Sequence, residues 1–238
     1  MRKTKIICTI GPAVDSPEAL EELMNAGMNV ARINFSHGNY EDQKDRIEMV
    51  KNVRAKLGKP VALLLDTKGP EIRIGKFADP NGIILEPGDT FRLVTDEIEG
   101  DKERISVSYK NLYNEISVGT TILINDGTIE TVVKEIDGED IVCEVIVGGK
   151  LTNRKSMNIP GSKINLPSLT EKDIDDLTFG AKVGFDYVAA SFIRKPEDVI
   201  NIRKVLVDNG GENIKIISKI ENREGIENFD KILEVSDG

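Results

Sequence analysis

Residues 61–73 read VALLLDTKGPEIR, an apolar run that changes abruptly into polar residues and backbone breakers. A continuous apolar run such as residues 61–65 is typical of a parallel strand covered on both faces, and chemistry in α/β folds gathers at the carboxyl ends of such strands. Asp66 stands at that end, and the breaker pair Gly69-Pro70 follows it. We therefore predict that this loop is both the edge of a functional site and a domain boundary. The simpler alternative is a capped strand followed by an ordinary turn.

Segments of strand and helix character alternate on both sides of this loop. Apolar residues recur at helical spacing after each strand, the Thr170 to Asp173 pattern resembles a capping box, and a final helix is predicted around residues 226–233. Successive strands are about one βα unit apart, except for one interval that is longer by roughly 95 residues. This pattern predicts a (β/α)8 barrel interrupted after its third strand. The predicted strands are residues 5–10, 29–35, 61–65, 187–192 and 214–220.

The long interval has a different pattern. After Ile74 the chain shows short β-type runs separated by turn pairs, as in a small antiparallel domain. We therefore predict a first barrel part at residues 1–70, an inserted antiparallel β-barrel domain at 71–165 and a second barrel part at 166–238. A closed barrel needs eight βα units. Because only five are present, we expect the barrel to be truncated.

Composition narrows the possible functions. Lys and Arg number 32 against 41 Asp and Glu, and this net charge of -9 argues against nucleic-acid or anionic-membrane partners. No apolar run approaches the roughly 20 residues of a membrane span, so we expect a cytoplasmic protein. Cys8 and Cys143 make no metal or redox motif and are expected to be reduced packing residues. His37 is the only histidine, so any acid–base or metal chemistry must use carboxylates, lysines, hydroxyls and water.

Two predicted strands carry polar residues in alternation. Arg32, Asn34 and Ser36 fall on one face of the strand at residues 29–35 and its continuation, with apolar residues between them. Lys219 and Glu221 have the same two-residue spacing near the end of the fifth strand. A half-exposed strand and a simple ion pair would also give these patterns. The carboxyl end of a parallel strand favours a site, in which a lysine faces a phosphate and a carboxylate binds a divalent metal.

Three segments resemble the signature segments of pyruvate kinase. They are VARINFSHG at residues 30–38, LDTKGPEIR at 65–73 and SKIEN at 218–222, and the similarity extends along the whole chain. The resemblance implies a (β/α)8 barrel with a β-rich lid domain inserted after strand three. It also implies transfer of the phosphoryl group of phosphoenolpyruvate to ADP, followed by protonation of the enolate, to give pyruvate and ATP.

The resemblance assigns roles to individual residues of this chain. Arg32 would hold phosphate charge between phosphoenolpyruvate and the nucleotide, and Lys219 would lie against the phosphoryl group in transfer. These two are the expected catalytic and substrate-binding residues. The expected nucleotide-binding residues are Asn34, His37, Arg73 and Lys155.

The resemblance also implies two kinds of metal ion. Glu221 would bind the Mg²⁺ or Mn²⁺ that bridges substrate groups. A shell of oxygen ligands would bind K⁺, a hard monovalent cation that offsets the charge of the substrate. The residues of that shell are Asn34, Ser36, Asp66 and Thr67.

The chain departs from the family pattern in what it lacks. The second magnesium carboxylate and the threonine associated with enolate protonation, both expected from the sixth strand onward, are absent, and so is the C-terminal regulatory domain. We therefore expect residues 1–238 alone to be inactive, and the full-length enzyme to be a homotetramer. Two alternatives stay open. One is another Mg²⁺-dependent phosphoenolpyruvate or pyruvate barrel enzyme, such as a carbon–carbon lyase that uses Glu221, and the other is an inactive fragment or scaffold.

Overall fold

The computed structural model describes residues 3–36 and 38–238, and the chain divides into two units. The first unit contains Met1–Pro70 and Pro167–Gly238, and the second contains Glu71–Leu166. Each unit has its own cluster of buried apolar side chains. The division falls at Pro70, directly after the loop in which the sequence pattern changes.

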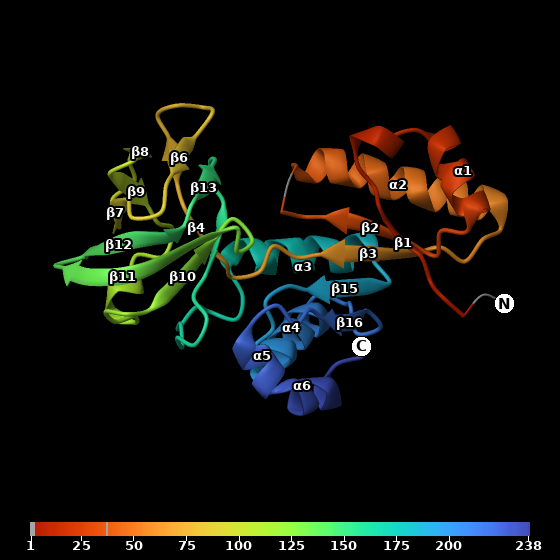
Figure 1. Cartoon of the computed structure of the whole chain (residues 1–238). Coiled ribbons are helices and arrows are strands. Elements are labelled where there is room, and N and C mark those ends of the chain that lie inside the picture. The colour runs from red at the N-terminus through yellow and green to blue at the C-terminus, as the bar shows by residue number, and fades with distance from the viewer. Residues whose placement is uncertain (1–2, 37) are drawn as a thin grey trace. The chain divides into compact units, whose positions relative to one another are not determined.

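The first unit is built on a five-stranded sheet in which every neighbouring pair is parallel (Figure 1). Its strands stand side by side in chain order, which is the order of successive strands in a parallel barrel. They are β1 (Ile7–Thr9), β2 (Val30–Asn34), β3 (Ala62–Asp66), β15 (Tyr187–Ala190) and β16 (Lys215–Ser218). The helices of this unit are α1 (Pro17–Ala26), α2 (Tyr40–Leu57), α3 (Glu171–Val183), α4 (Pro196–Asp208), α5 (Arg223–Glu227) and α6 (Phe229–Val235), with a 3-10 turn η1 (Pro12–Val14).

Local signals explain where the helices begin. The Thr170 hydroxyl accepts a hydrogen bond from the Asp173 amide, and the Asp173 carboxylate accepts one from the Thr170 amide, so the predicted capping box is confirmed. The prediction of one final helix was wrong. Asn228 leaves the helical conformation between α5 and α6, and its side-chain amide donates to the carbonyl of Arg194 at 2.9 Å. This hydrogen bond holds Asn228 at the boundary between the two short helices.

Several strands end earlier than the sequence predicts. β15 ends at Ala190 and β16 at Ser218, so the residues that follow each of them lie in the loops beyond the sheet. Beyond α6, the chain returns along β16, where the Asp237 amide donates to Ile216 O at 2.9 Å and the Ser218 amide to Gly238 O at 2.9 Å. These hydrogen bonds satisfy part of the outer edge of β16.

The second unit contains a seven-stranded sheet that closes on itself. The isolated pairing of Ile74 with Val107, and the hydrogen bond from the Gly75 amide to Ser106 O at 2.8 Å, join the two ends of the strand order. In that order its strands are β4 (Ile72–Arg73), β14 (Ser156–Asn158), β10 (Thr121–Ile124), β11 (Ile129–Asp137), β12 (Asp140–Val147), β7 (Thr90–Val94) and β9 (Arg104–Ser106). Two small pairs complete the unit, β6 (Ile83–Leu85) with β13 (Gly149–Leu151) and β5 (Lys76–Phe77) with β8 (Glu99–Gly100), together with the 3-10 turn η2 (Leu112–Asn114).

The prediction of a wholly antiparallel second unit was wrong at two places. β7 pairs with β9, and β5 with β8, in parallel. A parallel pair needs a connection that carries the chain back to its starting end, and residues 95–103 do this between β7 and β9. Hairpin turn signals such as Asp137-Gly138 are informative only for antiparallel neighbours, so they could not reveal these pairs.

Both cysteines pack as predicted. Cys143 is buried in the second unit, Cys8 is partly buried against the core of the first, and both are free thiols. Burial raises the pKa of the Cys143 thiol to about 12, which makes it unreactive at neutral pH. Within residues 3–36 and 38–238, no helix is both long and apolar enough to cross a membrane.

Candidate active site at the carboxyl ends of the parallel strands

Strand β2 alternates as its sequence predicts. Ala31 and Ile33 are fully buried on the face that packs into the apolar core, whereas Arg32 and Asn34 are only half-buried on the other face. Ser36 lies in the turn after the strand, and its amide donates to the Asn34 side-chain oxygen at 2.9 Å. The polar positions of the alternation therefore converge at the carboxyl end of β2.

Asp66, at the end of β3, is the centre of this region. Its side chain is only 4% exposed and lies between two cations. Oδ2 accepts hydrogen bonds from Nε of Arg32 at 2.8 Å and from Nη2 of the same residue, and Oδ1 accepts from Nζ of Lys219 at 3.1 Å. A single carboxylate thus contacts two cationic side chains, one on β2 and one in the loop that follows β16.

Lys219 and Glu221 lie in the loop beyond β16, not on the strand itself. The prediction that they share a strand face is therefore wrong, although the two side chains do meet, with 3.4 Å between Lys219 Nζ and Glu221 Oε1. The loop follows the strand's carboxyl end, so both groups still reach the same edge of the sheet. Glu221 Oε2 accepts a hydrogen bond from the backbone amide of Phe192 at 2.9 Å.

Ser191 is a member of this cluster that the sequence did not single out. Lys219 Nζ donates to its Oγ at 2.9 Å, and Ser191 Oγ donates to the carbonyl of Thr67 at 2.6 Å. The available signal was its position, since Ser191 follows the buried strand β15 as Asp66 closes β3. The apolar pattern instead predicts Ser191 as part of the strand at residues 187–192.

The donors expected to bind K⁺ lie at the adjacent ends of β2 and β3. Asn34 is the register partner of Asp66, and Thr67 is the next residue along the chain. Asp66 Oδ2 already accepts two hydrogen bonds from Arg32, whereas the Asn34 side-chain oxygen and Thr67 Oγ1 each accept one and keep a further lone pair. This oxygen-only donor set fits a hard monovalent cation. The structure brings three of the expected residues together here, and Ser36 follows on the same loop as Asn34.

A divalent metal would have a single protein carboxylate in this part of the chain. Among the described residues there is no group of three or more His, Cys, Asp and Glu side chains placed to hold a metal. Glu221 is about one-third exposed and has Oε1 near Lys219. Mg²⁺ is commonly bound by one or two carboxylates together with substrate phosphates, so one carboxylate fits this mode of binding.

Arg73 and Lys155 belong to the second unit, Arg73 at the end of β4 and Lys155 directly before the neighbouring strand β14. Arg73 pairs with Ser156 across β4 and β14, so Lys155 stands one position before that pair. Arg73 Nε donates to Glu71 Oε1, and its Nη1 donates to the carbonyl of Arg154 at 2.6 Å. The two expected nucleotide contacts are therefore neighbours within one unit. His37, the remaining expected contact, lies outside the described residues.

Comparison with known proteins agrees with these segments. The family model of the pyruvate kinase barrel domain matches residues 1–238. The chain belongs to the pyruvate kinase family. It is 52% identical over 240 residues to pyruvate kinase of Staphylococcus epidermidis, of which it covers 41%, and 53% identical over 239 residues to pyruvate kinase of Clostridium acetobutylicum, of which it covers 50%. The chain thus spans about half or less of these relatives.

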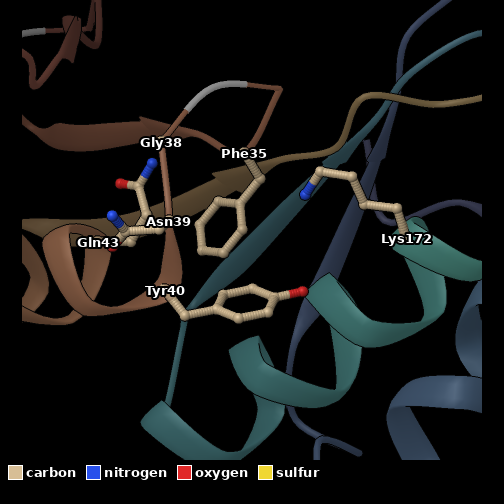
Figure 2. A pocket seen from close by; sticks show the side chains of 6 residues that line it. All are labelled: Phe35, Gly38, Asn39, Tyr40, Gln43 and Lys172. Carbon is tan, nitrogen blue, oxygen red and sulfur yellow. The ribbon is translucent and has the colours of Figure 1, made fainter.

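The first unit of this family member also has a pocket of about 350 Å³ away from the Asp66 cluster. Figure 2 shows Lys172 and Tyr40 facing it from α3 and α2. Lys172 Nζ donates to both oxygens of Asp176 at 2.8 Å, and the Tyr40 hydroxyl donates to Oδ1 at 2.7 Å. The ammonium is thus neutralised, so this pocket is a poor match for a phosphate. Its lining residues are Phe35, Gly38, Asn39, Tyr40, Gln43 and Lys172.

Proposed function

We propose that this chain supplies the phosphoryl-transfer groups of a pyruvate kinase, which moves the phosphoryl group of phosphoenolpyruvate to ADP and yields pyruvate and ATP. The observation that carries the proposal is the convergence of Arg32 and Lys219 on the buried Asp66 carboxylate. In a chain of net charge -9, two cations fixed at one strand edge make a local site for a phosphorylated anion.

The two cations would act by electrostatic stabilisation. Phosphoryl transfer spreads negative charge over the oxygens of the moving group, and fixed positive groups lower the energy of that state. Asp66 orients both side chains, and its single negative charge does not cancel their two positive charges. Lys219 has three N–H donors, and Asp66 and Ser191 occupy two of them. Glu221 Oε1 lies 3.4 Å from the same nitrogen, so the third donor would become available to a substrate oxygen once Glu221 holds a metal ion.

The remaining roles follow from where the side chains lie. Glu221 would hold Mg²⁺ or Mn²⁺, which would offset the negative charge of the phosphate groups. Asn34, Ser36, Asp66 and Thr67 would hold K⁺. Arg73 and Lys155, with Asn34 and His37, would bind the phosphates of ADP or ATP. Asp66 would thereby serve both as an orienting group and as a K⁺ ligand.

The proposed architecture is the first five βα units of a (β/α)8 barrel with a lid domain inserted after β3. The parallel strand order of the first unit and the closed sheet of the second support it. We propose the barrel parts at residues 1–70 and 166–238 and the lid at 71–165. The complete enzyme is proposed to be a cytoplasmic homotetramer. Residues 1–238 alone are proposed to form no ATP, because Glu221 is their single candidate magnesium carboxylate.

The test is Lys219→Met in an active polypeptide that continues residues 1–238 to the length of the pyruvate kinase relatives. ATP formation in a coupled assay should fall by a factor of about a thousand or more in kcat, while KM for phosphoenolpyruvate changes less than about tenfold, because the contact forms mainly in the transition state. Lys215→Met is the control, since Lys215 lies on β16, the strand that leads into the Lys219 loop, and pairs with Asp237. A near-normal kcat in Lys219→Met would refute the role.

A further inference from the structure

The turn that follows β15 makes contacts with both loops of the candidate active site. Ser191 is 6% exposed, its amide donates to Thr67 Oγ1 at 3.1 Å, and its hydroxyl donates to the Thr67 carbonyl at 2.6 Å. A serine hydroxyl has one proton, and here the Thr67 carbonyl takes it. Toward Lys219 the hydroxyl is therefore an acceptor, which matches an ammonium group that can only donate.

The next residue, Phe192, binds Glu221, which lies in the same loop as Lys219. Phe192 has a φ of +57°, a left-handed conformation that non-glycine residues seldom adopt. In this conformation its backbone amide donates to Glu221 Oε2 at 2.9 Å. Strained backbone of this kind persists where the surrounding structure enforces it, and it clusters at functional sites.

Gly69 lets the turn pack closely against the loop after β3. A Cβ atom at Gly69 would lie 2.8 Å from the carbonyl oxygen of Ser191 and 2.9 Å from its Cβ, and the φ of +69° also favours glycine. The loop that carries Asp66 and Thr67 is thus in direct contact with the turn that meets Lys219 and Glu221. This packing fixes the position of the Ser191 hydroxyl relative to the Asp66 carboxylate.

We propose that Ser191 is a positioning residue that fixes the Lys219 ammonium for phosphoryl transfer. This inference rests on the proposed function of Lys219. A lysine is a point charge on a flexible stem, so the contacts to Asp66 Oδ1 at 3.1 Å and to Glu221 Oε1 at 3.4 Å leave the ammonium free to shift between the two carboxylates. The shortest contact, to Ser191 Oγ at 2.9 Å, defines its place. Misplacement of a reacting group by about 1 Å can cost a hundredfold in rate.

The first measurement needs no activity. In the 238-residue chain labelled with ¹⁵N-lysine, relaxation of the Lys219 side-chain nitrogen reports how rigid the ammonium is. We expect a high order parameter in the wild type and a clear loss in Ser191→Ala. Ser218→Ala is the matched control, because the Ser218 hydroxyl bonds to Ser236 and not to Lys219. An equally ordered Lys219 in Ser191→Ala would overturn the proposal.

The second measurement uses the active polypeptide described above. Ser191→Ala should lower kcat by about ten- to a hundredfold and change KM for phosphoenolpyruvate by less than about threefold. Ser191→Cys keeps the shape but offers only a weak acceptor, so it should behave like Ser191→Ala. If both variants fail to unfold cooperatively, Ser191 is a structural residue and the proposal is wrong. If the Lys219 ammonium is ordered in the wild type but Lys219→Met keeps a near-normal kcat, the proposed function is refuted. The positioning of the Lys219 side chain by Ser191 would still stand.

Discussion

Asp66 and Asp176 are two buried aspartates of the same unit, and each contacts a lysine. Their side chains are 4% and 0% exposed, and their lysine contacts are 3.1 Å and 2.8 Å. Asp66 has a second cation, Arg32, whereas Asp176 has a neutral partner, the Tyr40 hydroxyl. In the first cluster Arg32 and Lys219 outnumber Asp66, and Glu221, 3.4 Å from Lys219, offsets the difference; a metal ion held by Glu221 would leave a positive charge that can receive an anion. The second is balanced, and it ties α2 to α3 without offering charge to a ligand.

The largest expected difference between the two clusters is in catalysis. Asp66→Asn should lower kcat by a factor of about a hundred or more in the active polypeptide, because an amide cannot hold two cations by charge and its N–H group would face one of them. Asp176→Asn should leave kcat within about twofold. Steady-state assays of ATP formation give both values.

A control at the other end of the same strands separates charge from position. Asp186 precedes β15, accepts a hydrogen bond from the Leu63 amide at 2.7 Å and pairs with Arg54 at 3.1 Å. In parallel barrels the amino ends of strands serve stability and the carboxyl ends serve chemistry. Asp186→Asn should therefore leave kcat unchanged. If Asp186→Asn and Asp66→Asn reduced kcat equally, the assignment of the site to the carboxyl ends would be wrong.

The two clusters also differ in how well their residues could be predicted from the sequence. Arg32 and Asp66 could be predicted, because alternation in β2 and the apolar run before Asp66 are local signals that point to strand ends. Asp176 meets Tyr40 across 136 positions of sequence, and neither residue lies in a motif. The sequence predicts a capping box near Asp176, but it does not predict the hydrogen bond from the Tyr40 hydroxyl of α2 to the buried Asp176 carboxylate of α3.

Other features of the structure could not be predicted because they leave no pattern in the local sequence. β4, β5 and β8 are two residues long, too short for any periodicity to appear. The sequence ASF at residues 190–192 continues an apolar pattern, so nothing local marks Phe192 as left-handed or Ser191 as a ligand of Lys219. Gly69 packs closely against that turn, and this contact between distant segments leaves no pattern in the local sequence.

A smaller effect is expected on stability. Asp176→Ala removes a fully buried carboxylate that accepts hydrogen bonds from the Tyr40 hydroxyl and from Lys172, and should lower the free energy of unfolding by about 2 kcal/mol. Lys172 is 44% exposed and can turn to water, which limits the loss. Urea unfolding measures it, with Asp175→Ala as the control because Asp175 is the exposed neighbour. Equal stability of the two variants would show that the cluster does not tie the helices.

The smallest effect is the pH dependence, in which Asp176 is compared with a third carboxylate, Asp237. Burial raises the pKa of Asp176 above its ordinary 3.8, against the opposing hydrogen bonds from Lys172 and Tyr40. For Asp237, burial alone would raise the pKa, but the Ile216 amide, Arg203 and Lys215 lower it to about 2. A carboxyl group whose pKa is raised on folding stabilises the protein at pH values below its pKa in the unfolded chain, and this stabilisation is lost as the pH rises through its pKa in the folded protein. A carboxyl group whose pKa is lowered stabilises the protein at pH values above its pKa in the unfolded chain, and this stabilisation is lost as the pH falls through its pKa in the folded protein.

The two aspartates should therefore change stability in opposite directions on acidification. Relative to Asp176→Asn, the wild type should gain stability as pH falls from neutral toward 3.8, because the buried carboxyl becomes protonated. Relative to Asp237→Asn, it should lose on the order of 1 kcal/mol as pH falls from about 4 to about 2, because the paired carboxylate is neutralised. Urea unfolding of the three proteins between pH 2 and 7 measures both differences. If both differences in the free energy of unfolding changed with pH in the same direction, burial would not dominate the pKa of Asp176. The Asp176 cluster would then behave as an ion pair, as Asp237 does.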